Sequence, residues 1–412
     1  MKKILFVINT LGRAGAETAL LELLNHLDTE KYEISLYVLL GQGEMISRVP
    51  PEVHIKNKRI CEDSVLSGAG RRKLLQTSVM ALFRHGHTME KIRYLMKNLR
   101  VMKKAGKIQP DKLLWRVLSD GADRLDETFD LAAAYLEGGS AYYVADHVNA
   151  KKKAAFVHIA YGDSGYTREM DRDCYEKMDV IYTVSGETRR HFLEFYPEYE
   201  EKVQVFHNII DRERIEREAK KPGGFSDSYD GVRILTVGRL AHQKAYDIAI
   251  LAMKQIRDAG YKARWYVVGE GPERKALEKQ IAELRLQKDF ILLGIKENPF
   301  PYYAQCDLYV HATRFEGKSI AIQEAQALGC AVIASDCAGN REQIEDGVDG
   351  LLCLLTQEGI ARKIEELIDD TEKKRADCGG SKTERERTDR GNLAAAGSDE
   401  VRRELWSRKK YY

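Results

Sequence analysis

Short apolar runs alternate with longer amphipathic segments along the first half of the chain. Residues 3–8 form a continuous apolar run, and residues 17–27, after a glycine-containing turn, place their leucines on one helical face. Further apolar runs predict strands at residues 33–40, 130–136, 153–158 and 180–184. Strands that alternate with helices in this way form a parallel sheet with helices on both faces.

The same alternation starts again after residue 210. A stretch rich in glycine, proline and serine at residues 222–227 predicts a loop. The apolar runs that follow it predict strands at residues 232–237, 265–268, 290–293, 308–311 and 331–335. We therefore expect an α/β protein with two doubly wound, Rossmann-like parallel-sheet domains, residues 1–210 and residues 211–375. Ligands bind beyond the carboxyl ends of such strands, so a central cleft that the domains face is the expected site.

Two segments do not follow this alternation. Residues 71–112 form a basic helical insert whose apolar stripe consists of Met89, Ile92, Met96, Leu99 and Met102. Residues 89–112 carry eight Lys or Arg against two acidic residues, so this helix either lies on an anionic membrane or packs on its own domain. Residues 376–412 lose helical periodicity, which predicts a weakly ordered basic tail able to pack back on the N-terminal domain.

Composition and charge exclude several classes of protein. Of the 412 residues, 43% are hydrophobic and 32% are charged, which is typical of a folded protein. The 66 Lys and Arg nearly balance the 64 Asp and Glu, so nucleic acid is not an expected partner. The seven cysteines never show C-x-x-C spacing, which excludes a zinc ribbon. Because no apolar stretch reaches the length of a membrane span or a signal peptide, we expect a cytoplasmic protein.

A loop with two glycines, Gly12 and Gly15, connects the first strand to the first helix. Glycines let a ligand approach the backbone, and a helix N-terminus offers unpaired N–H groups to an anion. The spacing is not G-x-G-x-x-G, and no acidic residue closes the second strand, so a nicotinamide cofactor is not indicated. The loop is either a phosphate-binding element or an ordinary turn.

Two cations follow the first strand of the second half. Arg239, directly after Gly238, and Lys244 stand five residues apart at the mouth of the expected cleft. A diphosphate leaving group needs such charges, because negative charge builds on it as its bond to carbon breaks. The alternative is a pair of solvated surface cations.

Two carboxylates follow the strand expected at residues 308–311. Glu316 lies in the loop, Ser319 is expected to cap the next helix, and Glu324 lies more than one turn into that helix. The backbone amides of residues 318–320 would face the same space, where they suit phosphate oxygens. A ligand with both hydroxyls and phosphates fits these groups, whereas a capping carboxylate and an unrelated surface carboxylate are the alternative.

In this order, the motifs resemble those of retaining glycosyltransferases of family 4, which have the GT-B fold of two Rossmann-like domains. The matching segments are Gly238-Arg239 with Lys244, Gly269-Glu270-Gly271-Pro272, and Glu316 with Glu324-Ala325 and Gly329. The combination is most similar to bacterial enzymes that assemble capsular or other surface polysaccharides. The resemblance implies transfer of a sugar from a UDP- or GDP-linked donor to a hydroxyl of a lipid-linked glycan acceptor, at the inner face of the cell membrane.

The resemblance also implies roles for individual residues. Arg239 and Lys244 match the pair that holds the donor diphosphate and stabilises it as it leaves, and Glu316 matches the carboxylate that contacts the transferred sugar. The implied donor-binding residues are Gly12, Gly15, Gly238, Gly294, Ile295, Gly317, Lys318, Ser319, Ile320 and Glu324. Some relatives carry a histidine after the strand at residues 130–136, and here either Glu137 or His158 takes that acceptor-side role.

In such enzymes the departing phosphate accepts the proton of the acceptor, so neither a protein base nor a metal nor a cofactor is expected. The D-x-D segment Asp171-Arg172-Asp173 is expected on a solvated helix face rather than at a metal. Two other functions remain open. One is a sugar-nucleotide epimerase of the same fold class, and the other is a non-catalytic protein that binds nucleotide sugars.

Overall fold

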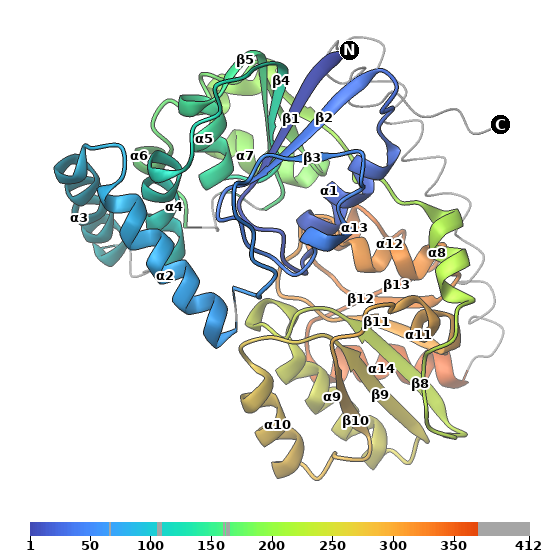
Figure 1. Ribbon diagram of the computed structural model, residues 1–412. Helices are drawn as coiled ribbons and strands as arrows, with labels where there is room; N and C mark the ends of the chain where they lie inside the picture. The colour runs from blue at the N-terminus through green and yellow to red at the C-terminus, as the bar shows by residue number, and fades with distance from the viewer. Residues whose placement is uncertain (66, 105–108, 160, 162–164, 370–412) are drawn as a thin grey trace. The chain divides into compact units, whose positions relative to one another are not determined.

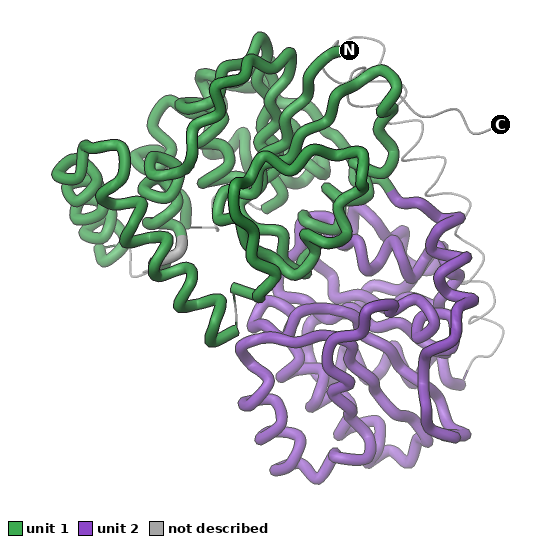
Figure 2. Tube along the Cα trace, in the orientation of Figure 1, with its two compact units in different colours: residues 1–209, 392–412 green, residues 210–391 purple. Residues whose placement is uncertain are grey.

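The computed structural model describes residues 1–65, 67–104, 109–159, 161 and 165–369 (Figure 1). The chain divides into two compact units, of which the first includes all described residues up to Ile209 and the second begins at Ile210 (Figure 2). Each unit has its own parallel sheet. The tail expected at residues 376–412 lies outside the described residues.

The first unit contains a seven-stranded parallel sheet in the order β3-β2-β1-β4-β5-β6-β7. Residues 4–8 of β1 are completely buried, because a parallel sheet with helices on both faces leaves its central strands no contact with solvent. The strands are β1 Lys2–Ile8, β2 Tyr32–Val38, β3 His54–Ile55, β4 Thr128–Ala134, β5 Asn149–Val157, β6 Val180–Thr183 and β7 Val203–Val205.

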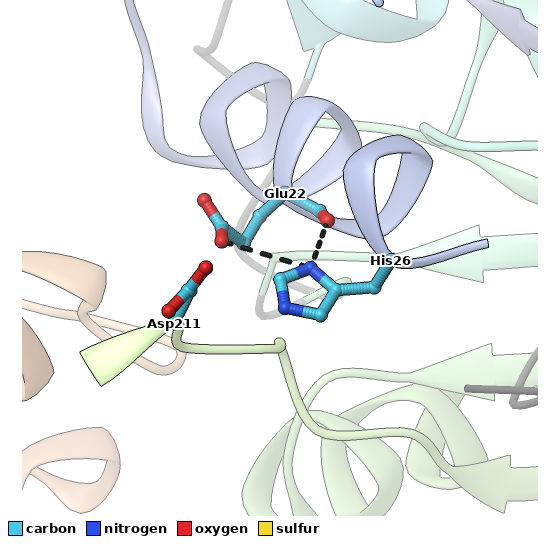
Figure 3. A group of neighbouring side chains, drawn as sticks. All are labelled: Glu22, His26 and Asp211. Carbon is cyan, nitrogen blue, oxygen red and sulfur yellow. Dashed lines mark hydrogen bonds and ion pairs between the residues drawn. The ribbon is translucent and has the colours of Figure 1, made fainter. Parts of the chain in front are cut away.

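Helices connect these strands. The α-helices of the first unit are α1 Gly15–His26, α2 Gly68–Phe83, α3 Thr88–Lys104, α4 Pro110–Gly121, α5 Gly139–His147, α6 Arg168–Asp171 and α7 Gly186–Phe195. At the end of α1, Nδ1 of His26 lies 2.8 Å from the carbonyl oxygen of Glu22 and 3.7 Å from its carboxylate (Figure 3). A protonated histidine at the C-terminal end of a helix interacts favourably with the negative end of the helix dipole.

The basic insert expected at residues 71–112 is not one amphipathic helix. Its described residues belong to α2, α3 and α4, and α3 buries Lys91, Tyr94, Asn98 and Met102. Lys91 turns inward because its ammonium group donates hydrogen bonds to the carbonyl oxygens of Ala81 and Arg84, at 2.8 and 2.7 Å, where α2 ends. Of the stripe residues, Met102 is buried and Ile92 is half-buried, whereas Met89, Met96 and Leu99 are exposed, so most of the stripe does not pack on its own domain.

The segment Asp171-Arg172-Asp173 also differs from its expected structure. Asp171 is fully buried, and the hydroxyls of three tyrosines donate hydrogen bonds of 2.6 Å to its carboxylate: Tyr142, Tyr161 and Tyr196. These phenols replace the water that a buried carboxylate loses. The expectation of a solvated helix face was wrong for Asp171, which instead joins α5, α6 and the residues after α7.

The second unit contains a six-stranded parallel sheet in the order β10-β9-β8-β11-β12-β13. Its strands are β8 Val232–Val237, β9 Ala263–Val268, β10 Phe290–Gly294, β11 Leu308–His311, β12 Ala331–Ser335 and β13 Leu351–Cys353. Its α-helices are α8 Arg212–Ala219, α9 Tyr246–Asp258, α10 Arg274–Glu283, α11 Phe300–Gln305, α12 Ile320–Ala327, α13 Ala338–Arg341 and α14 Gln357–Asp369. Asp211 caps α8, since its Oδ1 accepts a hydrogen bond from the backbone N–H of Arg214 at 2.8 Å.

The strand order reverses at one place in each sheet. In the first unit β1 lies between β2 and β4, and in the second unit β8 lies between β9 and β11. Connections on the two sides of such a point leave the sheet in opposite directions, which opens a crevice at the carboxyl ends of the strands. The loops after β1, β4, β8 and β11 are therefore the places where the fold itself favours ligand binding.

The strands expected from the apolar runs are all present. Their ends differ from the expected ends by at most four residues, the largest difference being at the start of β5. Three short strands, β3, β7 and β13, were not expected. Among the described residues, no helix combines the length and the apolar character needed to cross a membrane.

Candidate functional site

The loops after β8 and β11 bring three ionisable side chains together in the second unit. Lys244, in the 3-10 helix η4 (His242–Lys244), forms an ion pair with Oε2 of Glu316. His311, the last residue of β11, places Nε2 3.2 Å from that same oxygen and 3.3 Å from the Lys244 ammonium nitrogen. Thus the two charged groups expected from the sequence are in contact, and a histidine lies against both.

Burial and charge set the protonation of this cluster. Burial alone would raise the pKa of Glu316, but the charge of Lys244 and the hydrogen bond from His311 outweigh it and lower the pKa to about 2. Burial, together with the nearby Lys244, lowers the pKa of His311. Near neutral pH the cluster therefore consists of a carboxylate, an ammonium group and a neutral imidazole.

Arg239 differs from Lys244 in its surroundings. Its side chain is exposed and makes no ion pair or hydrogen bond with any described residue. Gly238 before it is fixed, because its N–H donates to the carbonyl oxygen of Val268 and its own carbonyl oxygen accepts a hydrogen bond from Tyr246, both at 3.0 Å. One of the two expected phosphate-binding cations is thus free, and the other is already paired.

Contacts between the loop after β8 and the loop after β11 fix the distance between Lys244 and Glu316. The side chain of Arg314 forms an ion pair with Asp247, with N–O distances of 2.7 and 3.1 Å. The backbone N–H of Arg314 donates to the carbonyl oxygen of Gln243 at 2.8 Å. The side-chain amide of Gln243 donates in return to the carbonyl oxygen of Phe315 at 2.9 Å. These bonds connect the neighbours of both charged residues, so the two loops act as one element.

Close packing at glycines supports the same loops. A Cβ atom on Gly269 would lie 1.9 Å from the carbonyl oxygen of Gly238, and Gly269 has φ +153°. A Cβ atom on Gly339, in α13, would lie 2.0 Å from the carbonyl oxygen of Gly317 and 2.3 Å from that of Glu316. Neither approach is possible for a residue with a side chain, so these glycines fix the loops that carry the cluster.

The start of α12 provides backbone donors beside Glu316. Ser319 is buried and occupies the N-cap position as expected, but its side chain makes no capping hydrogen bond. The N–H groups of Ser319 and Ile320 have no partner among the described residues. Lys318 and Gly317 precede them and are half-buried. A helix start with unpaired N–H groups favours an anion.

Glu324, one turn further into α12, is oriented by a tyrosine. The hydroxyl of Tyr303, on α11, donates a hydrogen bond of 3.0 Å to Oε2 of Glu324. At the end of β10, Gly294 has φ +73°, and the next residue, Ile295, is 47% exposed. The exposure of Ile295 is compatible with the donor-binding role expected for these two residues.

In the first unit, Glu137 and His158 follow the ends of β4 and β5. They are in contact, because Oε2 of Glu137 accepts a hydrogen bond of 3.1 Å from the backbone N–H of His158. Asn9, after β1, donates a hydrogen bond of 3.1 Å to the carbonyl oxygen of Glu137. The two acceptor-side candidates are therefore neighbours in one cluster.

Both acceptor-side candidates have perturbed pKa values. Burial raises the pKa of the Glu137 carboxyl, and burial lowers the pKa of His158 to about 4. The ring of His158 packs on Tyr135, with ring centres 5.1 Å apart, and its Nε2 is buried without a partner among the described residues. Perturbed ionisable groups at the carboxyl ends of central strands are typical of functional sites.

The loop after β1 holds Gly12 and Gly15. A Cβ atom on Gly12 would approach Oε2 of Glu44 at 3.3 Å, whereas one on Gly15 would meet nothing within 4 Å. The N-cap residue of α1, Ala14, provides no side-chain hydrogen bond. The helix start is therefore open, which is compatible with the phosphate-binding role expected for this loop.

Several residues of these clusters were not identified from the sequence. His311 was visible only as the last residue of an apolar strand, and Tyr303 only as part of a helical segment. Arg314 and Asp247 looked like ordinary surface charges. The available signal was position for three of them, because His311, Arg314 and Asp247 each lie within five residues of a predicted site residue, whereas Tyr303 gave no such signal.

Comparisons with known proteins show what the chain is similar to. Residues 225–385 match the family described as glycosyl transferases group 1. Over 222 residues the chain is 28% identical to an N-acetylgalactosamine-N,N'-diacetylbacillosaminyl-diphospho-undecaprenol 4-alpha-N-acetylgalactosaminyltransferase of Campylobacter jejuni. The aligned region is 53% of this chain and 59% of that protein. Over 143 residues the chain is 34% identical to a GDP-mannose-dependent alpha-mannosyltransferase of Corynebacterium glutamicum, covering 33% and 31% of the two chains.

Solved structures show the fold. The Anabaena protein Alr3699/HepE, crystallised in complex with UDP, matches with a TM-score of 0.64 and 17% identity over 97% of this chain and 99% of that chain. TarM of S. aureus matches with a TM-score of 0.62 and 12% identity over 98% and 99%. The chain spans about three fifths of the length of the C. jejuni relative. The expected fold is thereby confirmed: the protein has the GT-B fold and resembles group 1 glycosyltransferases of bacterial polysaccharide biosynthesis.

Proposed function

We propose that the protein is a retaining glycosyltransferase that moves a sugar from a nucleotide-diphosphate donor to a hydroxyl of a glycan acceptor. The observation that carries this proposal is the contact of Lys244, Glu316 and His311 beside the free cation Arg239, at the point of strand reversal in the second unit. Such a point favours ligands, and two cations there favour a diphosphate.

In the proposed reaction Arg239 and Lys244 bind the diphosphate and stabilise the charge that develops as it leaves. The N–H groups at the start of α12 add donors for phosphate oxygens. Glu316 accepts hydrogen bonds from hydroxyls of the transferred sugar, and Glu324 accepts them from the ribose. The departing phosphate takes the proton of the acceptor hydroxyl, so positioning and electrostatics replace a protein base, and the two side-chain cations make a metal ion unnecessary.

The relatives support a choice of donor and acceptor. The Anabaena structure contains UDP, and the C. glutamicum relative is named for GDP-mannose. The name of the C. jejuni relative describes an acceptor on diphospho-undecaprenol. We therefore propose a UDP- or GDP-linked donor and an acceptor glycan on a lipid diphosphate carrier, which the cluster of Glu137 and His158 in the first unit contacts.

A screen with UDP- and GDP-sugars tests the proposal. A bound donor raises the melting temperature of the full chain, and incubation with a polyisoprenyl diphosphate glycan then yields an extended product whose new linkage keeps the donor's anomeric configuration by NMR. Lys244→Ala and Glu316→Ala are expected to abolish transfer. Lys254→Ala, which removes a surface lysine paired with Asp258 on α9, is the matched control. Epimerisation of the donor alone, or binding without transfer to any acceptor, would replace this proposal with one of the two other functions.

The first unit also supports contact with a membrane, at a surface that we call the α2–α3 surface. Seven large apolar side chains on α2 and α3 are exposed: Leu75, Val79, Met80, Phe83, Met89, Met96 and Leu99. The exposed cations of the same helices are Arg71, Arg72, Lys73, Arg93, Lys97, Arg100, Lys103 and Lys104, whereas Glu90 is their only acidic residue. Exposed apolar groups among cations fit an anionic bilayer.

Sedimentation with lipid vesicles tests this contact. The protein is expected to pellet with vesicles that contain phosphatidylglycerol and to stay in solution with pure phosphatidylcholine vesicles. Phe83→Ser should weaken binding, whereas Leu354→Ser, which removes a similarly exposed apolar side chain from the second unit, should not. Equal binding of both variants would show that the α2–α3 surface is not the point of contact.

A further inference from the structure

We infer that His311 is a positioning residue that holds Glu316 in place when Lys244 leaves Glu316 for the diphosphate of the donor. The inference rests on the proposed function, since it concerns the state in which a nucleotide sugar is bound. It begins from the observation that Lys244 and His311 both contact the same oxygen, Oε2 of Glu316.

The ion pair presents a conflict. Lys244 forms an ion pair with Glu316 in the described state, yet it is also one of the two cations proposed to hold the diphosphate. A phosphate oxygen and a carboxylate compete for the same ammonium group, and the more highly charged diphosphate attracts it more strongly. Donor binding therefore exchanges the partner of Lys244.

Glu316 then needs another partner. Its side chain is only 14% exposed, and a buried carboxylate that loses its cation without another hydrogen bond is strongly disfavoured. Nε2 of His311 lies 3.2 Å from the carboxylate oxygen and belongs to the rigid end of β11, where its side chain is 1% exposed. It stays in place while Lys244, at the end of a flexible side chain, moves.

Tyr309 sets the tautomer that this role requires when its hydroxyl donates to His311 rather than to the carbonyl oxygen of Val237, 3.5 Å away. Its hydroxyl lies 3.2 Å from Nδ1 of His311, on the opposite edge of the ring from Glu316. When the tyrosine hydroxyl donates to Nδ1, the single proton of the neutral imidazole is on Nε2, where it is donated to Glu316. Burial and the charge of Lys244 lower the pKa of His311, and so keep the imidazole neutral in the described state.

The consequence for binding is specific. Glu316 is proposed to contact the transferred sugar, so the position of its carboxylate affects the binding of the sugar part of the donor most. Because the diphosphate of UDP or GDP also takes Lys244 from Glu316, loss of the His311 hydrogen bond is expected to weaken the binding of UDP or GDP, and to weaken the binding of the nucleotide sugar more strongly. It is also expected to remove most of the additional affinity and turnover that the sugar provides.

Three variants test this role with the full chain. In His311→Leu the donor to Glu316 is absent, and kcat is expected to fall about ten- to hundredfold, as is usual when a hydrogen bond to a charged group is lost. His311→Gln keeps an N–H donor near the position of Nε2 and is expected to restore most of kcat. Tyr309→Phe keeps the histidine but removes the group that fixes its tautomer, so an intermediate loss is expected.

The deciding measurement is the ratio of the dissociation constants of the nucleoside diphosphate and the nucleotide sugar, obtained by calorimetry. This ratio is expected to fall toward one in His311→Leu and to stay near the wild-type value in His311→Gln, with unchanged melting temperatures. An equal loss of affinity for both ligands, or no change in the ratio, would overturn the inference. Nitrogen-15 NMR of His311 provides a second check, because a proton on Nδ1 rather than Nε2 would contradict the proposed tautomer.

A failure of the proposed function gives a different result. If the wild-type protein bound neither UDP nor GDP, or if Glu316→Ala left the ratio unchanged, the assignment of the donor site itself would be wrong. If Glu316→Ala lowers the ratio and His311→Leu does not, the donor site is right and the role of His311 is wrong.

Discussion

Glu316→Gln is expected to abolish sugar transfer and at the same time to tighten the binding of UDP or GDP. The substitution removes the negative charge that holds Lys244 but keeps the size of the side chain. Lys244 is then free to bind the diphosphate, and the diphosphate no longer meets a carboxylate. Activity and nucleotide affinity should therefore change in opposite directions.

The magnitude follows from the protonation of Glu316. Its pKa is lowered from an ordinary 4.5 to about 2 by Lys244 and His311 against the opposing effect of burial, which corresponds to about 3 kcal/mol of favourable interaction. Donor binding has to replace the part of this energy that Lys244 contributes. If about half of it is recovered, the affinity for the nucleoside diphosphate increases by about tenfold, or ~1.4 kcal/mol.

Calorimetric titration of the full chain with UDP and with GDP measures this change. The matched control is Glu324→Gln, on the same helix start, because Glu324 is proposed to bind the ribose and its loss should weaken the same ligand. A dissociation constant that is unchanged or larger in Glu316→Gln would refute the reasoning, since it would show that the ion pair does not compete with the diphosphate. Parallel effects of the two substitutions would have the same meaning.

Three further predictions concern the loops around Lys244 and Glu316 and the pH dependence of stability. Ala245, directly after Lys244, has φ +47° and ψ +34°, so Ala245→Gly should relieve about 1 kcal/mol of backbone strain and raise the melting temperature; an equal or lower value would contradict this. Gly339→Ala places a Cβ atom 2.0 Å from the carbonyl oxygen of Gly317, so it should displace the Glu316 loop and reduce transfer at least tenfold, whereas Gly68→Ala, where nothing lies within 4 Å of a Cβ atom, should retain it. Because the pKa of Glu316 is lowered in the folded state, its contribution is complete above pH 4.5 and is lost as the pH falls toward 2. Between pH 7 and pH 3 the free energy of unfolding of Glu316→Gln should therefore decrease by ~2 kcal/mol less than that of the wild type, measured by urea denaturation; identical decreases would show that the pKa of Glu316 is not lowered.

The sequence predicted the long strands well because each is a buried run of apolar residues that is long enough to be recognised. It did not predict β3, β7 and β13, which have only two or three residues and therefore no recognisable periodicity. It also did not decide which face of α3 is buried. There the hydrogen bonds of Lys91 to the end of α2 outweigh the apolar pattern, and such a contact between helices is not visible in either helix alone.

The residues of the candidate site could be predicted individually, but the contact between Lys244 and Glu316 could not. Residue type and loop position indicated Arg239, Lys244 and Glu316 as separate groups. The sequence contains no signal that Lys244 and Glu316 contact each other, because their proximity depends on the hydrogen bonds of Gln243 and Arg314 between two loops about seventy residues apart. Similarly, the burial of Asp171 depends on three tyrosines from different segments, which a local reading treats as independent.

The arrangement of strand ends has a consequence for how proteins of this kind diversify. The residues proposed to stabilise the leaving diphosphate, Arg239 and Lys244, lie after β8 in the second unit, whereas those proposed to contact the acceptor, Glu137 and His158, lie after β4 and β5 in the first. Mutations after β4 or β5 can then change which glycan is extended without altering the loops that activate the donor. Such a chain can acquire a new acceptor by changing a few loop residues, with both sheets and the Lys244 cluster left intact.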